Sequence, residues 1–211
     1  LQKLGKSHQG RCKTHSAIVH PSHTTASKET MCLNIYQIGF DFTYALADVS
    51  EQRGLANSLD LYDDTPELIR AFEYKWVTED AIRLPKLILI MSKLLGISAD
   101  SYPKIKSAVH GLETVDIDIQ GELYKIFVDL PVVKNGLNLH KSKITRFSTG
   151  DIMHIDSPVF LPKDYPPLFK IAEESASFFC SSELYNEIVS NKLSGWLFHS
   201  CPIKSKSWFN F

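Results

Sequence analysis

Cysteines that could pair with histidines are the first residues in this 211-residue chain that could do chemistry. Cys180 together with His154 or His199 could supply a nucleophile and a base, if the fold brought them together. Phe178 and Phe179 directly precede Cys180, however, and an apolar flank is typical of a buried structural thiol. We therefore predict no catalytic residue here, and a small enzyme using a Cys/His or carboxylate pair remains an alternative.

A pair of aspartates is the second candidate. Asp116 and Asp118 could be catalytic carboxylates, because they lie two residues apart on one predicted strand face. They alternate with Val115, Ile117 and Ile119, and this period of two predicts a half-buried strand with its carboxylates outward. Alternation alone accounts for the pair, so we again predict no catalytic role.

Three aspartates before a predicted helix suggest a metal site. Asp60, Asp63 and Asp64 lie close together, with Glu67 and Glu73 nearby. No glycine stands where a calcium loop makes its sharp turn, and the alternation of oxygen ligands is absent. We interpret the segment as a solvated loop that leads into a helix, and we predict neither a metal nor another cofactor.

The first thirty residues differ from the rest. Residues 1–30 hold five basic side chains against Glu29 alone, a local charge of +4 that leaves −5 on the remainder of a chain whose net charge is −1. They have no helical or strand period, which predicts a disordered or loosely packed arm. Met31 follows directly, so the arm could also be extraneous to the native protein.

The same arm carries four of the eight histidines, and two alternatives follow from it. Cys12, Cys32 and the histidines could form a metal site, but their spacing is irregular. A nucleic-acid-binding arm would need interleaved aromatic residues, which are absent. A metal- or nucleic-acid-binding module therefore stays a second alternative. The histidines of this segment are His8, His15, His20 and His23.

Composition and missing motifs exclude several classes. There is no P-loop, GxGxxG, GxSxG, HExxH or kinase signature. The longest apolar run, about Leu84 to Ile97, is interrupted by charges and too short to cross a bilayer. No signal peptide is evident, so we expect a cytoplasmic protein with no membrane or nucleic-acid partner. In that compartment its four cysteines are expected as free thiols.

Periodicity predicts an α+β fold with mainly antiparallel sheets and a few packed helices. Leu33–Phe40, Leu123–Val128, 144–147 and 152–155 are predicted strands, and Gly121-Glu122 is a predicted turn. Leu84–Leu95 is a predicted helix that ends at Gly96, because its apolar residues follow spacings of three and four. Thr65 followed by Pro66 predicts another helix start. We expect four regions: the arm 1–30, subdomains 31–105 and 106–200, and a tail 201–211.

One stretch, Pro166–Phe198, predicts a complete sequence of elements: strand, turn, strand, helix, glycine turn and strand. Ser181 or Ser182 is suited to cap the helix Ser182–Asn191, with Glu183 in its first turn. Gly195 is suited to a left-handed stop or turn after the helix.

This stretch resembles the C-terminal part of a family of bacterial polymorphic-toxin immunity proteins, the family labelled immunity family eleven. The pattern in that family is similar to "P-x-F-R/K-I … strand-Ser-helix … L-x-G-x-x-F". The matching residues here are Pro167–Ile171, Phe179-Cys180-Ser181 with Leu184, and Leu193–Phe198. Weaker similarities are Ile35-Tyr36, Trp76, Leu84-Pro85 and Lys141-Ser142.

The resemblance implies a protein that binds and neutralises a cognate toxin stoichiometrically. Such a function needs shape and charge complementarity and no catalytic residue, and an acidic surface commonly meets a basic toxin. The acidic remainder of the chain permits this. Within the family pattern, Phe169, Gly195 and Phe198 are expected to be structural. The resemblance does not mark the partner-binding residues.

Overall fold

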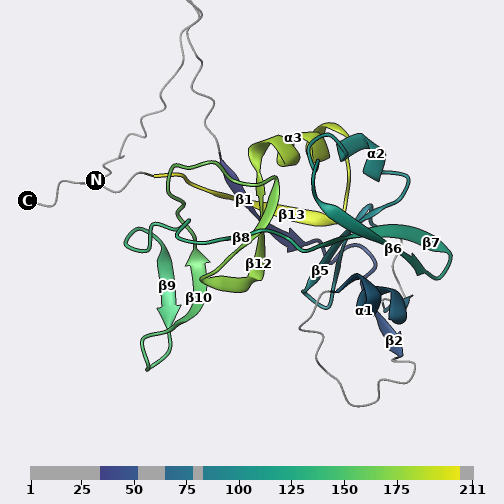
Figure 1. Cartoon of the computed structure of the whole chain (residues 1–211), viewed down its shortest axis with the longest axis horizontal. Helices are drawn as coiled ribbons and strands as arrows, with labels where there is room; N and C mark the ends of the chain where they lie inside the picture. The colour runs from purple at the N-terminus through teal and green to yellow at the C-terminus, as the bar shows by residue number, and fades with distance from the viewer. Residues whose placement is uncertain (1–33, 52–64, 78–82, 205–211) are drawn as a thin grey trace, which may run out of the picture. The chain divides into compact units, whose positions relative to one another are not determined.

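Strands dominate the protein, and short helices pack against them (Figure 1). The computed structural model describes residues 34–51, 65–77 and 83–204. The strands are β1 (Ile35–Phe40), β2 (Ala47–Glu51), β3 (Glu73–Trp76), β4 (Leu87–Ile90), β5 (Leu94–Ser98), β6 (Glu113–Ile119), β7 (Glu122–Val128), β8 (Val132–Val133), β9 (Lys143–Arg146), β10 (Ile152–Ser157), β11 (Leu168–Ile171), β12 (Glu174–Ser181) and β13 (Trp196–Cys201). The helices are α1 (Pro66–Ala71), α2 (Tyr102–Ile105) and α3 (Ser182–Ser190). This confirms the predicted α+β class.

A six-stranded sheet has the order β2-β3-β6-β7-β5-β4. It curls until its two edge strands, β2 and β4, approach each other. The inward side chains form one hydrophobic core, which includes Ile88, Ile117 and Ile126 and is closed at one end by Ile69 of α1. The alternation predicted for β6 is confirmed, because Val115, Ile117 and Ile119 are buried while Asp116 and Asp118 are exposed.

A five-stranded sheet has the order β13-β1-β12-β11-β8, so β1 near the start of the described chain lies between two strands from its end. One face packs against α3, α2 and the outer side of β4, β5 and β7, through side chains such as Phe178, Leu184 and Leu95. The other face forms a third core around Phe160, Phe169 and Phe179. The aromatic rings of these three residues contact one another.

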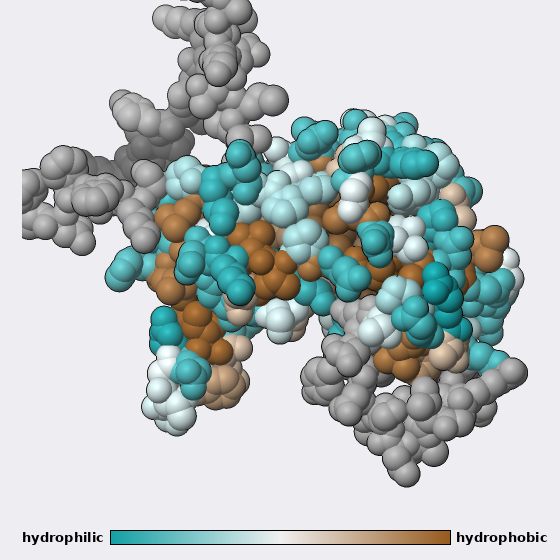
Figure 2. Space-filling view, viewed as in Figure 1, coloured by the Kyte–Doolittle hydropathy of each residue, from teal (hydrophilic) through white to brown (hydrophobic). Residues whose placement is uncertain are grey.

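The third sheet is the hairpin of β9 and β10. Ile155 of β10 is buried in the third core, and Ile144 and Ile152 pack against it. The outer side chains are exposed, including Phe147 at 52% and Met153 at 57%. Hydrophobic side chains accordingly run along this hairpin in the lower left of Figure 2.

The helix predicted for Leu84–Leu95 is wrong, because this segment forms the β4–β5 hairpin. Met91 and Ser92 at its turn have φ of 50° and 57°, the left-handed conformation of a tight hairpin connection. Leu87, Ile88, Ile90, Leu94 and Leu95 are all buried, on both faces of the sheet. A strand that lies between two cores has apolar residues at nearly every position. Such a run also contains apolar residues three and four positions apart, which is the pattern of an amphipathic helix.

Most other predicted elements are confirmed. Thr65 caps α1, with its side chain accepting from the Leu68 N–H at 3.4 Å, and Ser181 caps α3 in the same way. The β6–β7 turn lies at Gln120-Gly121, one residue before the predicted position, and both residues have positive φ.

The sheets do not divide near residue 105. Each of the two large sheets takes strands from both sides of that position, and Cys32–Phe211 forms one compact unit. The expected arm 1–30 lies outside the described residues, as does most of the expected tail 201–211, although Cys201 ends β13. No helix within the described ranges is long and apolar enough to cross a membrane.

Candidate functional site

The stretch 166–198 connects the two large sheets. Its predicted strand–strand–helix–strand order is confirmed as β11, β12, α3 and β13. The main-chain oxygen of Ser194 accepts hydrogen bonds from the main-chain N–H groups of Lys86 (3.0 Å) and Leu87 (2.8 Å), at the start of β4. Gly195 has a φ of 120°, and a Cβ atom there would lie 2.0 Å from the Leu87 oxygen. Only glycine fits this contact without displacement of the backbone.

Phe169 and Phe198, the other two residues expected to be structural, also pack against hydrophobic cores. Phe169 is fully buried. Phe198 packs edge to face against Tyr36 and Tyr185, whose rings stack at 3.9 Å between centroids. The geometry of these side chains therefore assigns them an architectural part.

The cysteine and histidine candidates do not meet. Cys180 pairs with Tyr36 across β12 and β1, whereas His199 pairs with Gln37, so their side chains lie on opposite faces of the five-stranded sheet. His154 lies on β10, whose neighbouring Ile155 packs against the face away from Cys180. Burial raises the pKa of the Cys180 thiol far above its ordinary value. A protonated, enclosed thiol is a poor nucleophile.

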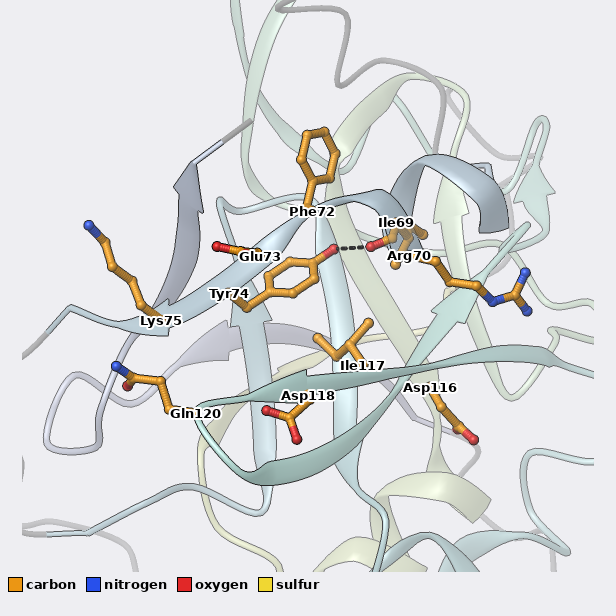
Figure 3. Close-up of a pocket in the computed structure, with 10 residues that line it drawn as sticks. All are labelled: Ile69, Arg70, Phe72, Glu73, Tyr74, Lys75, Asp116, Ile117, Asp118 and Gln120. Atoms are coloured by element: carbon orange, nitrogen blue, oxygen red, sulfur yellow. Dashed lines mark hydrogen bonds between the residues drawn. The ribbon is translucent and has the colours of Figure 1, made fainter. Parts of the chain in front are cut away.

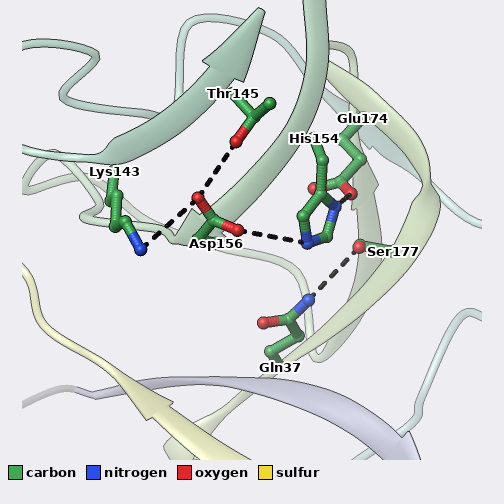
Figure 4. A network of polar contacts seen from close by, with 7 residues as sticks. All are labelled: Gln37, Lys143, Thr145, His154, Asp156, Glu174 and Ser177. Atoms are coloured by element: carbon green, nitrogen blue, oxygen red, sulfur yellow. Dashed lines mark hydrogen bonds and ion pairs between the residues drawn. The ribbon is translucent and has the colours of Figure 1, made fainter.

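His154 instead fastens the β9–β10 hairpin to the five-stranded sheet (Figure 4). Its Nδ1 atom lies 2.7 Å from Oε1 of Glu174 on β12, and its Nε2 atom lies 3.9 Å from Oδ1 of Asp156. Asp156 also accepts from the Thr145 hydroxyl at 3.2 Å and lies 3.8 Å from Nζ of Lys143. All the polar partners of this imidazole in Figure 4 are therefore side chains that position the hairpin.

A cavity of about 370 Å³ lies beside this hairpin, lined by Gln37, Asp156 and His199 among others. Gln37 donates to the Ser177 hydroxyl at 3.2 Å. Within the described ranges, no group of three or more His, Cys, Asp and Glu side chains is arranged to hold a metal ion.

The aspartate pair lines a larger groove of about 670 Å³ between α1, β3 and β6 (Figure 3). Asp116 forms an ion pair with Lys125 of β7. Asp118 accepts from the Gly121 N–H at 2.8 Å and so fixes the β6–β7 turn. Each carboxylate therefore has a structural partner. Both aspartate side chains nevertheless stay exposed along the groove.

The groove exists because the six-stranded sheet splits between β3 and β6. The two strands are parallel and joined by one residue pair, Tyr74 and Ile119. Beyond it, the Trp76 N–H is satisfied by the Gln120 side-chain oxygen at 3.1 Å instead of by a strand partner. In the other direction β3 gives way to α1, which packs beside β6. A helix cannot continue a ladder of main-chain hydrogen bonds with a strand.

The floor of the groove is apolar. Ile117 and Ile69 are buried there. The Tyr74 hydroxyl donates to the Ile69 carbonyl at 2.8 Å, and burial raises the pKa of that hydroxyl well above its usual range, so it remains a neutral donor. In Figure 3 the side chains of Arg70 and Lys75 extend away from Tyr74 to either side.

Part of this site could be predicted from the sequence. Asp116 and Asp118 follow from the alternation of β6, whereas the apposition of α1 and β6 depends on contacts between distant segments. Of the suspected metal ligands, Glu67 lies in α1 and Glu73 in β3. The others lie outside the described residues, namely Asp60, Asp63, Asp64, Cys12, Cys32 and the four histidines of the arm.

Comparisons with known proteins add no assignment: no protein-family model matches this chain, and no curated protein matches it.

Proposed function

We propose that this chain is a toxin-neutralising binding protein, which occupies a cognate bacterial toxin in a stoichiometric complex. The observation that carries the proposal is the resemblance of residues 166–198 to polymorphic-toxin immunity proteins. The matching segments Pro167–Ile171 and Leu193–Phe198 contribute β11 and β13 to the same five-stranded sheet, with Gly195 and Phe169 in tightly packed positions. The resemblance implies that these residues maintain the packing of a scaffold, which presents a binding surface elsewhere.

Two surface features support a protein partner. The β9–β10 hairpin carries Phe147 and Met153 with more than half of each side chain exposed. The groove beside β6 combines an apolar floor with exposed carboxylates. Exposed apolar side chains within a polar rim are typical of protein–protein contact surfaces. A cytoplasmic location, where the toxin would act on its own producer, belongs to the same proposal.

The test is co-production of the full chain with the toxin encoded beside its gene. We expect growth to be restored, and the two purified proteins to form a one-to-one complex by size exclusion with light scattering. The matched control is Gly195→Ala, which should abolish protection together with folding. A toxin that stays fully active with equimolar folded chain would contradict the proposal.

A further inference from the structure

The outer edge of β9 is an open strand edge in the smallest sheet. The Phe147 N–H donates to the Asp151 oxygen at 2.9 Å, and the Gly150 N–H donates to the Phe147 oxygen at 3.0 Å. The main-chain groups of Phe147 therefore face β10 and its turn. Both register shifts of the hairpin lie in β10, so β9 keeps a regular alternation. The main-chain groups of Ile144 and Arg146 consequently point away from β10.

No described helix or strand covers this edge. Among the described elements, only β10 packs extensively against β9. Figure 1 accordingly shows β9 at the outer margin, with β10 between it and β12. Beyond the ladder with β10, the main-chain groups of Ile144 and Arg146 make no hydrogen bond to a described residue. A row of unpaired N–H and C=O groups is a template for an added strand.

The side chains around the edge are basic. Residues 134–148 hold four lysine or arginine side chains and no acidic one. The Arg146 guanidinium donates to the Gly150 carbonyl at 2.8 Å and, within the described ranges, forms no ion pair with a carboxylate. The Lys143 side chain is 78% exposed, and its Nζ atom lies 3.8 Å from Asp156. A second copy of the chain would add the same positive charges, so the edge favours an acidic partner strand over self-pairing.

The order of side chains along β9 specifies the partner strand. Ile144 packs against the third core, and Phe147 is largely exposed. Residues directly opposite each other in an antiparallel pair have Cβ atoms about 5 Å apart. Acidic residues of an added antiparallel strand would lie opposite Lys143 and Arg146. Its apolar residues would lie opposite Ile144 and Phe147. Read from its N-terminus, the matching pattern is apolar, acidic, any residue, apolar, acidic.

We propose that β9 binds an extended acidic–apolar segment of the partner, which joins the β9–β10 hairpin as a third, antiparallel strand. The inference rests on the proposed function, because it assigns that segment to the toxin. Main-chain hydrogen bonds supply the affinity of a ladder, and Lys143 and Arg146 select the acidic segment. A third strand also suits this sheet, since a hairpin of two strands is marginally stable by itself.

The probe is the peptide Thr-Val-Glu-Thr-Val-Glu-Thr with blocked ends, titrated into the isotope-labelled full chain. We expect the amide signals of Ile144 and Arg146 to shift and their hydrogen exchange to slow at least tenfold at saturation. Binding should weaken as salt is added, because the charges are exposed. The same peptide with lysine in place of glutamate should not bind. Equal binding of both peptides, or shifts confined to another surface, would overturn the proposal.

Two matched variants separate the main-chain contact from charge. Arg146→Ala removes the guanidinium and keeps the N–H, so binding should weaken several-fold. Arg146→Pro removes both, and it should fold because a proline is tolerated where the N–H faces an open edge. It should bind the peptide at least tenfold more weakly than the alanine variant. Equal affinities of the two variants would show that no strand is added.

Peptides with N-methyl groups test the same ladder without altering the chain. The first glutamate and the second valine lie opposite Arg146 and Ile144, so N-methylation of both removes two donors to the ladder and should abolish binding. N-methylation of the middle threonine, whose N–H points away from β9, should be tolerated. If both methylated peptides bind as tightly as the unmodified one, no ladder forms.

The charge argument and the second copy have their own controls. Arg146→Glu should reduce peptide binding at least fivefold, whereas Lys104→Glu, on α2, should leave it unchanged. If these two glutamate variants bind equally, the charge argument fails. A purified chain that is dimeric without peptide, and monomeric as Arg146→Pro, would assign the edge to a second copy and overturn the proposal.

Failure of this inference is distinguishable from failure of the proposed function. A chain that protects cells from its toxin, and does so equally as Arg146→Pro, refutes the added strand alone. A chain that gives no protection while the acidic peptide still orders Arg146 refutes the toxin partner and leaves the strand-binding edge.

Discussion

The indole nitrogen of Trp196 donates a hydrogen bond of 3.0 Å to the main-chain oxygen of Ile88, which joins β13 of one large sheet to β4 of the other. The bond is buried, and the two residues are separated by more than one hundred positions. We expect Trp196→Phe to lower the free energy of unfolding by about 1–3 kcal/mol, because it removes the donor and leaves much of the ring. Urea unfolding followed by circular dichroism measures this.

The matched control is Leu197→Ala, one residue further along β13, whose side chain is 43% exposed. This substitution should lower the free energy of unfolding by less than Trp196→Phe does, since it removes little apolar area from a core. Equal losses at the two positions would show that the buried bond does not hold the sheets together.

Substitution of Gly195 by alanine should be among the most damaging changes in the chain. The new Cβ would lie 2.0 Å from the Leu87 oxygen and 2.7 Å from the Pro85 Cβ, at a φ of 120°. Strain and overpacking together predict a loss of about 3 kcal/mol or more. Thermal unfolding of the purified variant, or its absence from the soluble fraction, is the measurement.

Gly121→Ala provides the comparison, because its φ of 94° is also positive but nothing lies within 4 Å of the added atom. It should lose only about 1–2 kcal/mol, the cost of left-handed backbone for an L-residue. If both glycine variants were equally stable, the close approach of β13 to β4 would be refuted.

The contrast between β6 and β4–β5 shows which parts of the fold could be predicted. Strand β6 follows from its sequence because one face is buried and the other is exposed, so apolar residues alternate with carboxylates. Strands β4 and β5 lie between two cores and carry apolar residues on both faces, so their pattern loses its period. Leu89 and Ile90 did not fit a single apolar face of the predicted helix, and this misfit was the only indication in the sequence that the helix prediction was wrong.

The candidate site could be predicted only in part, for a related reason. Asp116 and Asp118 follow from local alternation. The split in the sheet depends on α1 taking the place that β3 would occupy beside β6, and on Gln120 satisfying the Trp76 N–H 44 positions away. Contacts between segments so distant in sequence leave no periodic signal. The placement of β1 between β12 and β13 was unpredictable on the same ground.

The two described thiols should be unreactive in the folded chain. Burial raises the pKa of Cys180 strongly and that of Cys201 to about 11, so at pH 8 only about one thiolate in a thousand forms at Cys201. In a Cys12→Ser, Cys32→Ser background we expect modification by a disulfide reagent only as fast as the chain unfolds. Rapid labelling at pH 8 without denaturant would contradict this and revive the enzyme alternative, for which Cys180→Ser is then the decisive variant.

Asp100 should titrate well below an ordinary aspartate. Hydrogen bonds from Ser98 (2.6 Å) and then from Lys86 (2.9 Å) lower its pKa to about 2, against the opposing effect of burial. Because the pKa is depressed in the folded state, the stabilisation is complete above about pH 4 and is lost as the pH falls toward 2. We expect the difference in stability between the wild-type chain and Asp100→Asn to shrink across that window.

The direct measurement is the carbon chemical shift of the Asp100 carboxyl between pH 5 and pH 1.5. Ser98→Ala removes the first of the causes, so its Asp100 should titrate at a higher pH than in the wild-type chain. A wild-type midpoint for Asp100 near pH 4 would show that these hydrogen bonds do not favour the ionised carboxylate. In that case no acid-dependent stability should be assigned to this turn, because the effect depends wholly on the difference between the folded and unfolded pKa.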